Sequence, residues 1–191
     1  MMPKVIRHAG WVALLASAAA SACSSPAPSA DAFVNATVGS SSASQNATCN
    51  LAASVTVVAL GSQNGTQPGT VPDGDSHASI QCTVSGSGSG YSLRLYANGP
   101  GGTMVVTGNV TSQGGTVSGN FLTSEGSYAS NACTISYTYN GVPVPTKSPI
   151  GPGQIFGHVS CPDAQSSGTQ IGSSAVSCDA EADFLFQNCG Q

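Results

Sequence analysis

The chain is poor in charged residues. Only 6% of its 191 residues are charged, with four Lys and Arg against eight Asp and Glu. After residue 22 the only basic residues are Arg94 and Lys147. Binding to nucleic acid depends on clustered Lys and Arg that neutralise phosphates, so we expect no nucleic-acid partner. We interpret the acidic excess as favouring solubility and not as a ligand-binding feature.

Aromatic residues and helical patterns are also scarce. Aromatics make up 6% of the chain, and its one Trp, Trp11, lies near the N-terminus. No stretch after residue 22 has the apolar spacing of a long helix. Low charge combined with moderate hydrophobicity is not the profile of a disordered chain, so we expect folded β-structure.

Familiar catalytic patterns are missing. There is no Cys-x-x-Cys, and His77 and His158 fall on different predicted strands without the spacing of a zinc site. Residues 86–90, Gly-Ser-Gly-Ser-Gly, have the spacing of a nucleophile elbow, but the surrounding pattern predicts a hairpin, not a strand followed by a helix. We therefore expect no enzyme, no cofactor and no metal centre; a hydrolase is the third-ranked interpretation.

The N-terminus has the layout of an export signal. Lys4 and Arg7 precede an apolar segment, residues 11–22, which ends in small residues before Cys23. A membrane-spanning helix needs about 20 apolar residues, so this shorter segment predicts a signal peptide over residues 1–22.

The exit Ala20-Ser21-Ala22-Cys23 resembles the lipobox of bacterial lipoproteins. The resemblance implies cleavage before Cys23, diacylglycerol on its thiol, and attachment to a membrane without crossing it. Ser24 stands where the family places residues associated with outer-membrane sorting. The family usually has Leu at the position of Ala20, so an A-x-A site for the ordinary signal peptidase stays open as an alternative.

The cysteine count agrees with that interpretation. Seven is odd, and exported proteins oxidise their thiols in pairs, so assigning Cys23 to lipid leaves six for disulfides. The alternative is that Cys23 is a free or intermolecularly paired thiol. Sequence alone allows fifteen connectivities of the six. Expected strand ends favour three pairs among them: Cys161 with Cys178, Cys133 with Cys189, and Cys49 with Cys82.

The chain divides at its change of composition. Residues 23–48 are rich in Ser, Ala, Asn and Pro and predict a lipid-attached flexible tether. Residues 33–38 are either part of that tether or a first edge strand. Residues 49–191 form one predicted domain, because the length suits a single core.

From Cys49 onward apolar and polar residues alternate, with breaks at Gly, Pro and Asn. Tyr91, Leu93 and Leu95, for example, share one face of a run. Such short runs predict an all-β fold, a single antiparallel β-sandwich or open barrel stapled by disulfides. The eight expected strands are residues 53–60, 77–85, 91–97, 103–111, 116–123, 133–140, 154–161 and 178–186. Two long loops, residues 61–76 and 162–177, are expected to separate strands.

Two groups of carboxylates are weak candidates for binding. Asp73 and Asp75 flank a glycine in a polar loop, which suits calcium but is also a common turn sequence. Asp179, Glu181 and Asp183 alternate along the last predicted strand and should share one face. They are interpreted mainly as the solvated side of an edge strand, with a cation or basic partner as the alternative.

Aromatic candidates for a sugar platform are few. Tyr96 and Phe156 fall opposite the apolar faces of their predicted strands. They predict at most a small glycan-binding surface.

The lipobox-like start, the tether and the ending of residues 184–189, Phe-Leu-Phe-Gln-Asn-Cys, resemble small bacterial lipoproteins of myxobacterial type. The resemblance implies a surface location and no particular activity. We expect a membrane-anchored, non-enzymatic structural or interaction module of the cell surface or periplasm, attached by lipid at Cys23. The alternative is a module that binds glycan or calcium; a protein or glycan partner is left unspecified.

Overall fold

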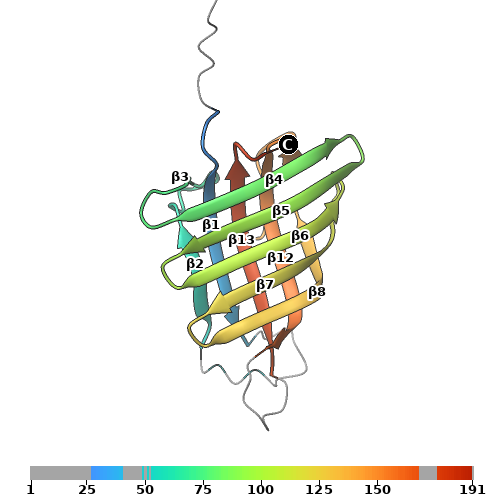
Figure 1. Ribbon diagram of the computed structural model, residues 1–191. Helices are drawn as coiled ribbons and strands as arrows, with labels where there is room; N and C mark the ends of the chain where they lie inside the picture. Colours follow the sequence, from blue (N-terminus) through green and yellow to red (C-terminus); the bar gives the residue numbers. More distant parts are fainter. Residues whose placement is uncertain (1–26, 41–48, 50, 52, 168–175, 191) are drawn as a thin grey trace, which may run out of the picture.

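The computed structural model describes residues 27–40, 49, 51, 53–167 and 176–190. These residues form an all-β structure, as expected, built on one large antiparallel sheet in the order β2-β1-β13-β12-β8-β7-β6-β5-β4 (Figure 1). The strands are β1 (Asp31–Gly39), β2 (Val55–Leu60), β3 (Val71–Pro72), β4 (Ser79–Ser87), β5 (Gly90–Gly99), β6 (Gly102–Val110), β7 (Gly115–Thr123), β8 (Gly126–Ser136), β9 (Thr138–Tyr139), β10 (Val142–Pro143), β11 (Ile150–Gly151), β12 (Gln154–Ser166) and β13 (Ser177–Gln187).

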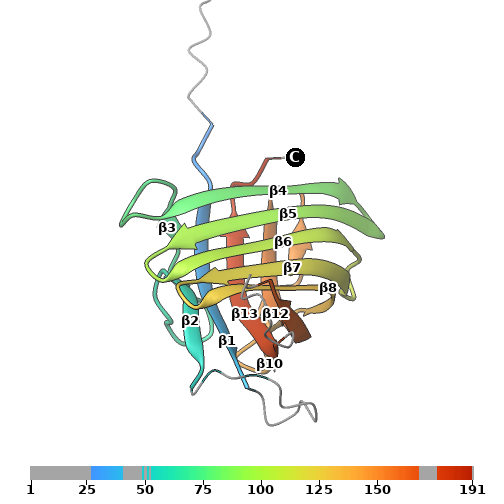
Figure 2. The ribbon, with the colours of Figure 1, turned by 60° about the horizontal axis from the view of Figure 1, so that its bottom comes forward.

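The sheet curls strongly, so its two halves face each other as a half-barrel. Figure 1 shows β4 to β8 as a front layer that crosses the rear layer of β2, β1, β13 and β12 at a steep angle. Figure 2 shows the same two layers from below. Each strand therefore has one side toward the core and one side toward solvent, which explains the two-residue alternation.

The core lies between the layers. On β1 and β13 the inward positions pair Val34 with Phe184 and Ala36 with Ala182, and all four side chains are buried. From the opposite layer, Phe121 of β7 is also fully buried. Each large apolar side chain buried in this way contributes about 1.5–3 kcal/mol, so the alternation holds the two layers together.

The free edge of β4 is closed by the end of the chain. The Val84 N–H donates to the Gly190 carbonyl at 2.9 Å, and the Gly190 N–H donates to the Cys82 carbonyl at 3.0 Å. The Gly153 N–H also donates to the Val84 carbonyl at 2.9 Å. An unpaired edge invites strand addition by another chain, and these contacts occupy it.

The other edge, β2, lies against the turn between β5 and β6. A Cβ added to Gly101 would lie 3.0 Å from the Val57 carbonyl oxygen, and one added to Gly99 would lie 2.8 Å from a methyl of Leu60. Gly101 also has a φ of 108°, which disfavours other residues. The glycines of this turn therefore let it approach β2 closely.

All six predicted cysteines form disulfides, but the three predicted pairings are wrong. The observed bonds join Cys49 to Cys178, Cys82 to Cys189, and Cys133 to Cys161. The expected Cys161–Cys178 pair fails because β12 does not end at Cys161. It continues through a bulge to Ser166, so Ala164 is the residue opposite Cys178.

Two further expectations about position are also wrong. Residues 31–39, within the predicted tether, form strand β1, so the alternative of a first strand over residues 33–38 is confirmed, but β1 lies between β2 and β13 and not at an edge. The acidic stripe predicts an edge position for the last strand as well, but β13 lies between β1 and β12. Small residues such as Ala32 and Ala36 made β1 resemble a linker, although they fit beside the large side chains of β13. Residues 41–48 and 168–175, within the predicted tether and loop, lie outside the described residues.

Gly119 leaves room for a buried disulfide, which gives a test of the packing. A Cβ at this position would lie 2.8 Å from the sulfurs of both Cys133 and Cys161. We expect Gly119→Ala to lower the free energy of unfolding by about 1–3 kcal/mol through overpacking. Gly90→Ala is the control, because nothing lies within 4 Å of its added Cβ, and it should change stability by no more than about 0.5 kcal/mol. Urea unfolding followed by circular dichroism measures both, and equal midpoints for the two variants would contradict this packing.

Candidate functional site

The outer sides of the two layers differ in chemistry. Strands β4 to β8 contain a single charged side chain, Arg94, and no carboxylate. The outward side of β1, β12 and β13 instead carries a concentration of ionisable groups: Asp31, His158, Asp179, Glu181 and Asp183. The molecule therefore presents a nearly uncharged surface on one side and an acidic one on the other.

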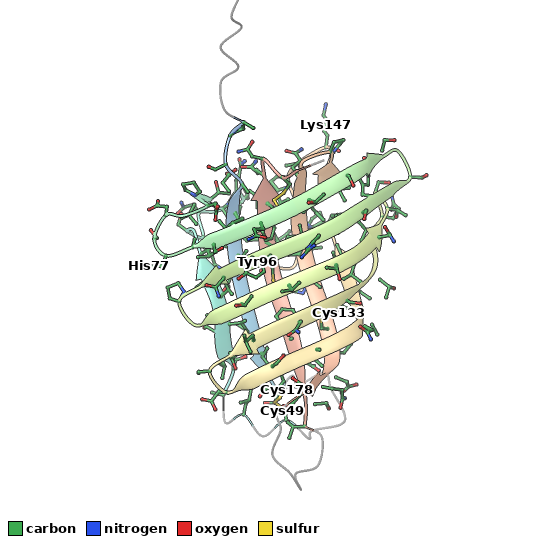
Figure 3. All side chains as sticks on the ribbon, viewed as in Figure 1. Cys49, His77, Tyr96, Cys133, Lys147 and Cys178 are labelled. Atoms are coloured by element: carbon green, nitrogen blue, oxygen red, sulfur yellow. A yellow bond between two sulfur atoms is a disulfide. The ribbon has the colours of Figure 1, made fainter. Side chains whose placement is uncertain are left out.

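We call the outward-facing side chains of β4 to β8 the polar face. Figure 3 views this face, with Tyr96 of β5 labelled. It is formed because every second residue of these strands points away from the core. Its members are Ser79, Gln81, Thr83, Ser85, Ser92, Arg94, Tyr96, Asn98, Thr103, Val105, Thr107, Asn109, Thr116, Ser118, Asn120, Leu122, Ser127, Ala129 and Thr134.

One cross-strand row runs through the middle of the polar face. The strand registers place Gln81 opposite Tyr96, Tyr96 opposite Val105, and Val105 opposite Asn120. Gln81 and Asn120 are exposed, and Tyr96 and Val105 are half-buried. The row thus combines two amides with a small apolar centre.

Hydrogen bonds fix some of these side chains. The Asn98 amide nitrogen donates to the Thr103 hydroxyl at 2.7 Å, and the Ser127 hydroxyl donates to the Asn120 amide oxygen at 2.9 Å. Within the described part of the chain, the Tyr96 hydroxyl and the Arg94 guanidinium have no hydrogen-bond or ion-pair partner. The face therefore holds oriented amides beside polar groups that are free to meet a ligand.

The three carboxylates of β13 do share the outward face, as expected, but each has a different environment. Asp183 Oδ1 lies 3.0 Å from His158 Nδ1 on β12. Asp179 accepts a hydrogen bond from the Asp163 backbone N–H at 3.0 Å, at the bulge of β12. Glu181 is exposed. Across the described residues no three His, Cys, Asp or Glu side chains are grouped closely enough to hold a metal ion.

His158 also has a serine neighbour across the sheet. Ser136 of β8 lies opposite His158, which in turn lies opposite Asp183. The Ser136 hydroxyl shares a 3.0 Å hydrogen bond with the Thr138 hydroxyl. The row lies on a continuous sheet, where strand pairing already uses the backbone N–H groups that an oxyanion hole would need. This arrangement gives a hydrolase no transition-state stabilisation.

Asp73 and Asp75 lie in the loop before β4. Asp73 Oδ1 accepts a hydrogen bond from the Ile80 backbone N–H at 2.7 Å, so its carboxylate caps the start of that strand. The Asp75 backbone carbonyl accepts the Ala78 N–H at 2.7 Å, while its carboxylate is exposed. Both contacts stabilise a turn, which accounts for an Asp-Gly-Asp sequence without a bound ion.

The two aromatic residues predicted as a sugar platform do not lie together. Phe156 is only 3% exposed and belongs to the rear layer. It forms a small second cluster with Phe33, Leu185 and Tyr139, the last coming from β9, which covers them. The platform of Tyr96 and Phe156 is therefore wrong, and Tyr96 alone stays on an accessible face.

Two tyrosines have raised pKa values. Burial, with a smaller contribution from Tyr91, raises the pKa of Tyr137 to about 12, and its hydroxyl donates to the Thr111 carbonyl. Burial and the nearby Glu125 raise the pKa of Tyr128. Both phenols stay neutral at physiological pH, so neither supplies a base. Because the folded-state pKa of Tyr137 exceeds its usual value of 10.0, its contribution to stability is present below pH 10 and is lost as the pH rises toward 12.

A cavity of about 660 Å³ lies where the two ends of the described chain meet. Its lining combines small residues such as Pro28, Gly153 and Gly190 with the amides of Gln154, Gln187 and Asn188. The cavity lies beside Cys189, where the disulfide to Cys82 joins the end of the chain to β4. No ionisable side chain of the described residues lines it.

Comparisons with known proteins give no family. No protein-family model matches the chain, and no curated protein or solved structure is significantly similar to it. Among the described residues there is no helix with the length and hydrophobicity to span a membrane. The polar face is thus identified from its own chemistry. The sequence signal for it was the absence of any carboxylate between Asp75 and Glu125.

The structural role of Asp73 can be separated from calcium binding. We expect Asp73→Ala to lower the free energy of unfolding by roughly 1–2 kcal/mol, because the Ile80 N–H loses its acceptor. Asp75→Ala is the matched control and should have little effect. Thermal unfolding measures both, with and without calcium chloride. A calcium-dependent rise in Tm that Asp73→Ala abolishes would contradict the capping role.

Proposed function

We propose that this protein is an exported, lipid-anchored binding module without enzymatic activity, held at the membrane surface by Cys23. It acts by presenting a folded, disulfide-stapled domain outside the cytoplasm. The rear layer of the domain is acidic, and the front layer presents the polar face.

One observation carries this proposal. The three disulfides use every cysteine of the chain except Cys23. Disulfides form in oxidising compartments outside the cytoplasm, which supports export. The remaining cysteine follows the apolar segment that resembles a signal peptide, where diacylglycerol would attach.

The position of β1 supports a short attachment. Asp31, the first residue of β1, comes eight residues after Cys23. Eight extended residues span at most about 28 Å, so a lipid on Cys23 would hold the domain close to the membrane. Asp31 lies opposite Gln187 of β13, so the end of the half-barrel near the C-terminus would face the membrane. The polar face lies along the side of the domain and would stay accessible.

A ligand-binding role is favoured over a purely structural one by the polar face. Its amides, its half-buried tyrosine and its unpaired Arg94 are arranged across neighbouring strands. The acidic groups elsewhere on the domain already favour solubility, so the amides of this nearly uncharged surface are available for binding.

Intact mass spectrometry tests the anchor. Expressed in a bacterium that processes lipoproteins, the protein should have a mature mass beginning at Cys23 with a diacylglyceryl adduct. Reduction should add two hydrogens for each of the three disulfides. The control variant Cys23→Ser should show the same mass increase on reduction, but it should carry no lipid and should no longer be found in the membrane fraction. An unacylated wild-type terminus, or free thiols before reduction, would contradict the proposal.

A further inference from the structure

We propose that the polar face binds an extended, uncharged polysaccharide, with Tyr96 as its central contact. This inference rests on the proposed function as a surface-displayed module, but not on the lipid itself. It concerns the outward side of β4 to β8, where the structure places an accessible aromatic ring among amides and hydroxyls.

The first argument is the apolar centre of the face. Tyr96 lies opposite Val105, and Leu122, which is 48% exposed, lies in the neighbouring row, opposite Thr103. The C–H faces of a sugar ring are apolar and pack against such side chains, above all against an aromatic ring. The Tyr96 hydroxyl has no partner among the described residues, so it can bond to a sugar hydroxyl at the same time.

The second argument is the ring of amides around that centre. Asn98 and Asn120 are each held by one hydrogen bond, which leaves the Asn98 side-chain oxygen and the Asn120 amino group without a hydrogen-bond partner among the described residues. Gln81 adds a third, exposed amide. Amides both donate and accept hydrogen bonds, as sugar hydroxyls do, and oriented groups bind at lower entropic cost.

The third argument is charge. A polyanion needs several cations, and the face has only Arg94. A basic partner needs carboxylates, and β4 to β8 contain none. Asp179, Glu181 and Asp183 lie on the opposite layer, on β13, whereas Asp73, Asp75 and Glu125 lie in turns outside the strands of this face. The face is therefore complementary in charge to a neutral ligand.

The fourth argument is shape. The central row crosses strands that are about 4.8 Å apart, a spacing comparable to one sugar unit, and it continues over four neighbouring strands. A row of side chains on an open sheet surface suits a chain of several sugars that lies across the strands. A single small molecule would instead need an enclosed pocket. Such open contacts give modest affinity, with a Kd of about 10 µM to 1 mM.

Affinity electrophoresis of the mature chain carrying Cys23→Ser tests the proposal. The native gels contain hydroxyethyl cellulose, galactomannan or dextran as uncharged probes, and alginate as the charged one. We expect retardation by at least one uncharged polymer, and none by alginate. Tyr96→Ala should raise the apparent Kd for that polymer at least about tenfold. Tyr96→Phe should keep the apparent Kd within about threefold of wild type, because the aromatic ring remains.

His158→Ala on the opposite layer is the matched control and should bind as the wild type does. No retardation by any uncharged polymer, retardation by alginate alone, or unchanged binding by Tyr96→Ala would each overturn the proposal. Circular dichroism confirms that each variant is folded. If the protein proves to be lipid-anchored with three disulfides but binds no glycan, this inference is refuted and the proposed lipid anchor is not.

Discussion

The structure depends on the position of its last strand. β13 lies between β1 and β12, and disulfides tie the residues at or next to its ends, Cys178 and Cys189, to Cys49 and Cys82. These two bonds span 129 and 107 residues of sequence. Closing loops of this length removes much entropy from the unfolded chain, about 4–5 kcal/mol each in the chain-entropy description. The half-barrel can therefore close only when the end of the chain is in place.

The same arrangement decides which surfaces are free. Gly190 occupies the edge of β4, and the turn before β6 lies against the other edge strand, β2. Both edges are thus contacted from within the chain, and the two outer faces of the sheet carry its exposed side chains. The rear one is acidic and partly covered by β9, whereas the front one is the polar face. Closure of the sheet thus directs any binding to side chains and not to strand addition.

Much of this fold is predictable from sequence. The two-residue alternation of apolar and polar residues locates most of the long strands, because one side of each strand is buried and the other is exposed to solvent. β1 is ambiguous, because Ala32 and Ala36 look like linker residues until their large neighbours on β13 are known. The disulfide pairs depend on strand register, and the sequence predicts a loop from Pro162 onward, where β12 in fact continues.

The candidate site is less predictable. Tyr96 is recognisable as outward-facing from its own strand, but its neighbours Gln81 and Val105 come from other strands and depend on pairing. Phe156 has the same pattern as Tyr96 and is buried, because a segment beyond the sheet covers it. Alternation reports the two sides of one strand and cannot report what packs over them.

A tryptic digest without reduction tests the central claim most directly. After residue 22 the chain has two cleavage sites, Arg94 and Lys147, so the denatured protein with blocked thiols yields three fragments. The observed disulfides join the first and second fragments to the third, so one linked species should contain all three, separating only on reduction. Release of a free fragment ending at Arg94 would show that the first half of the chain is not tied to the last strand, and would contradict the account.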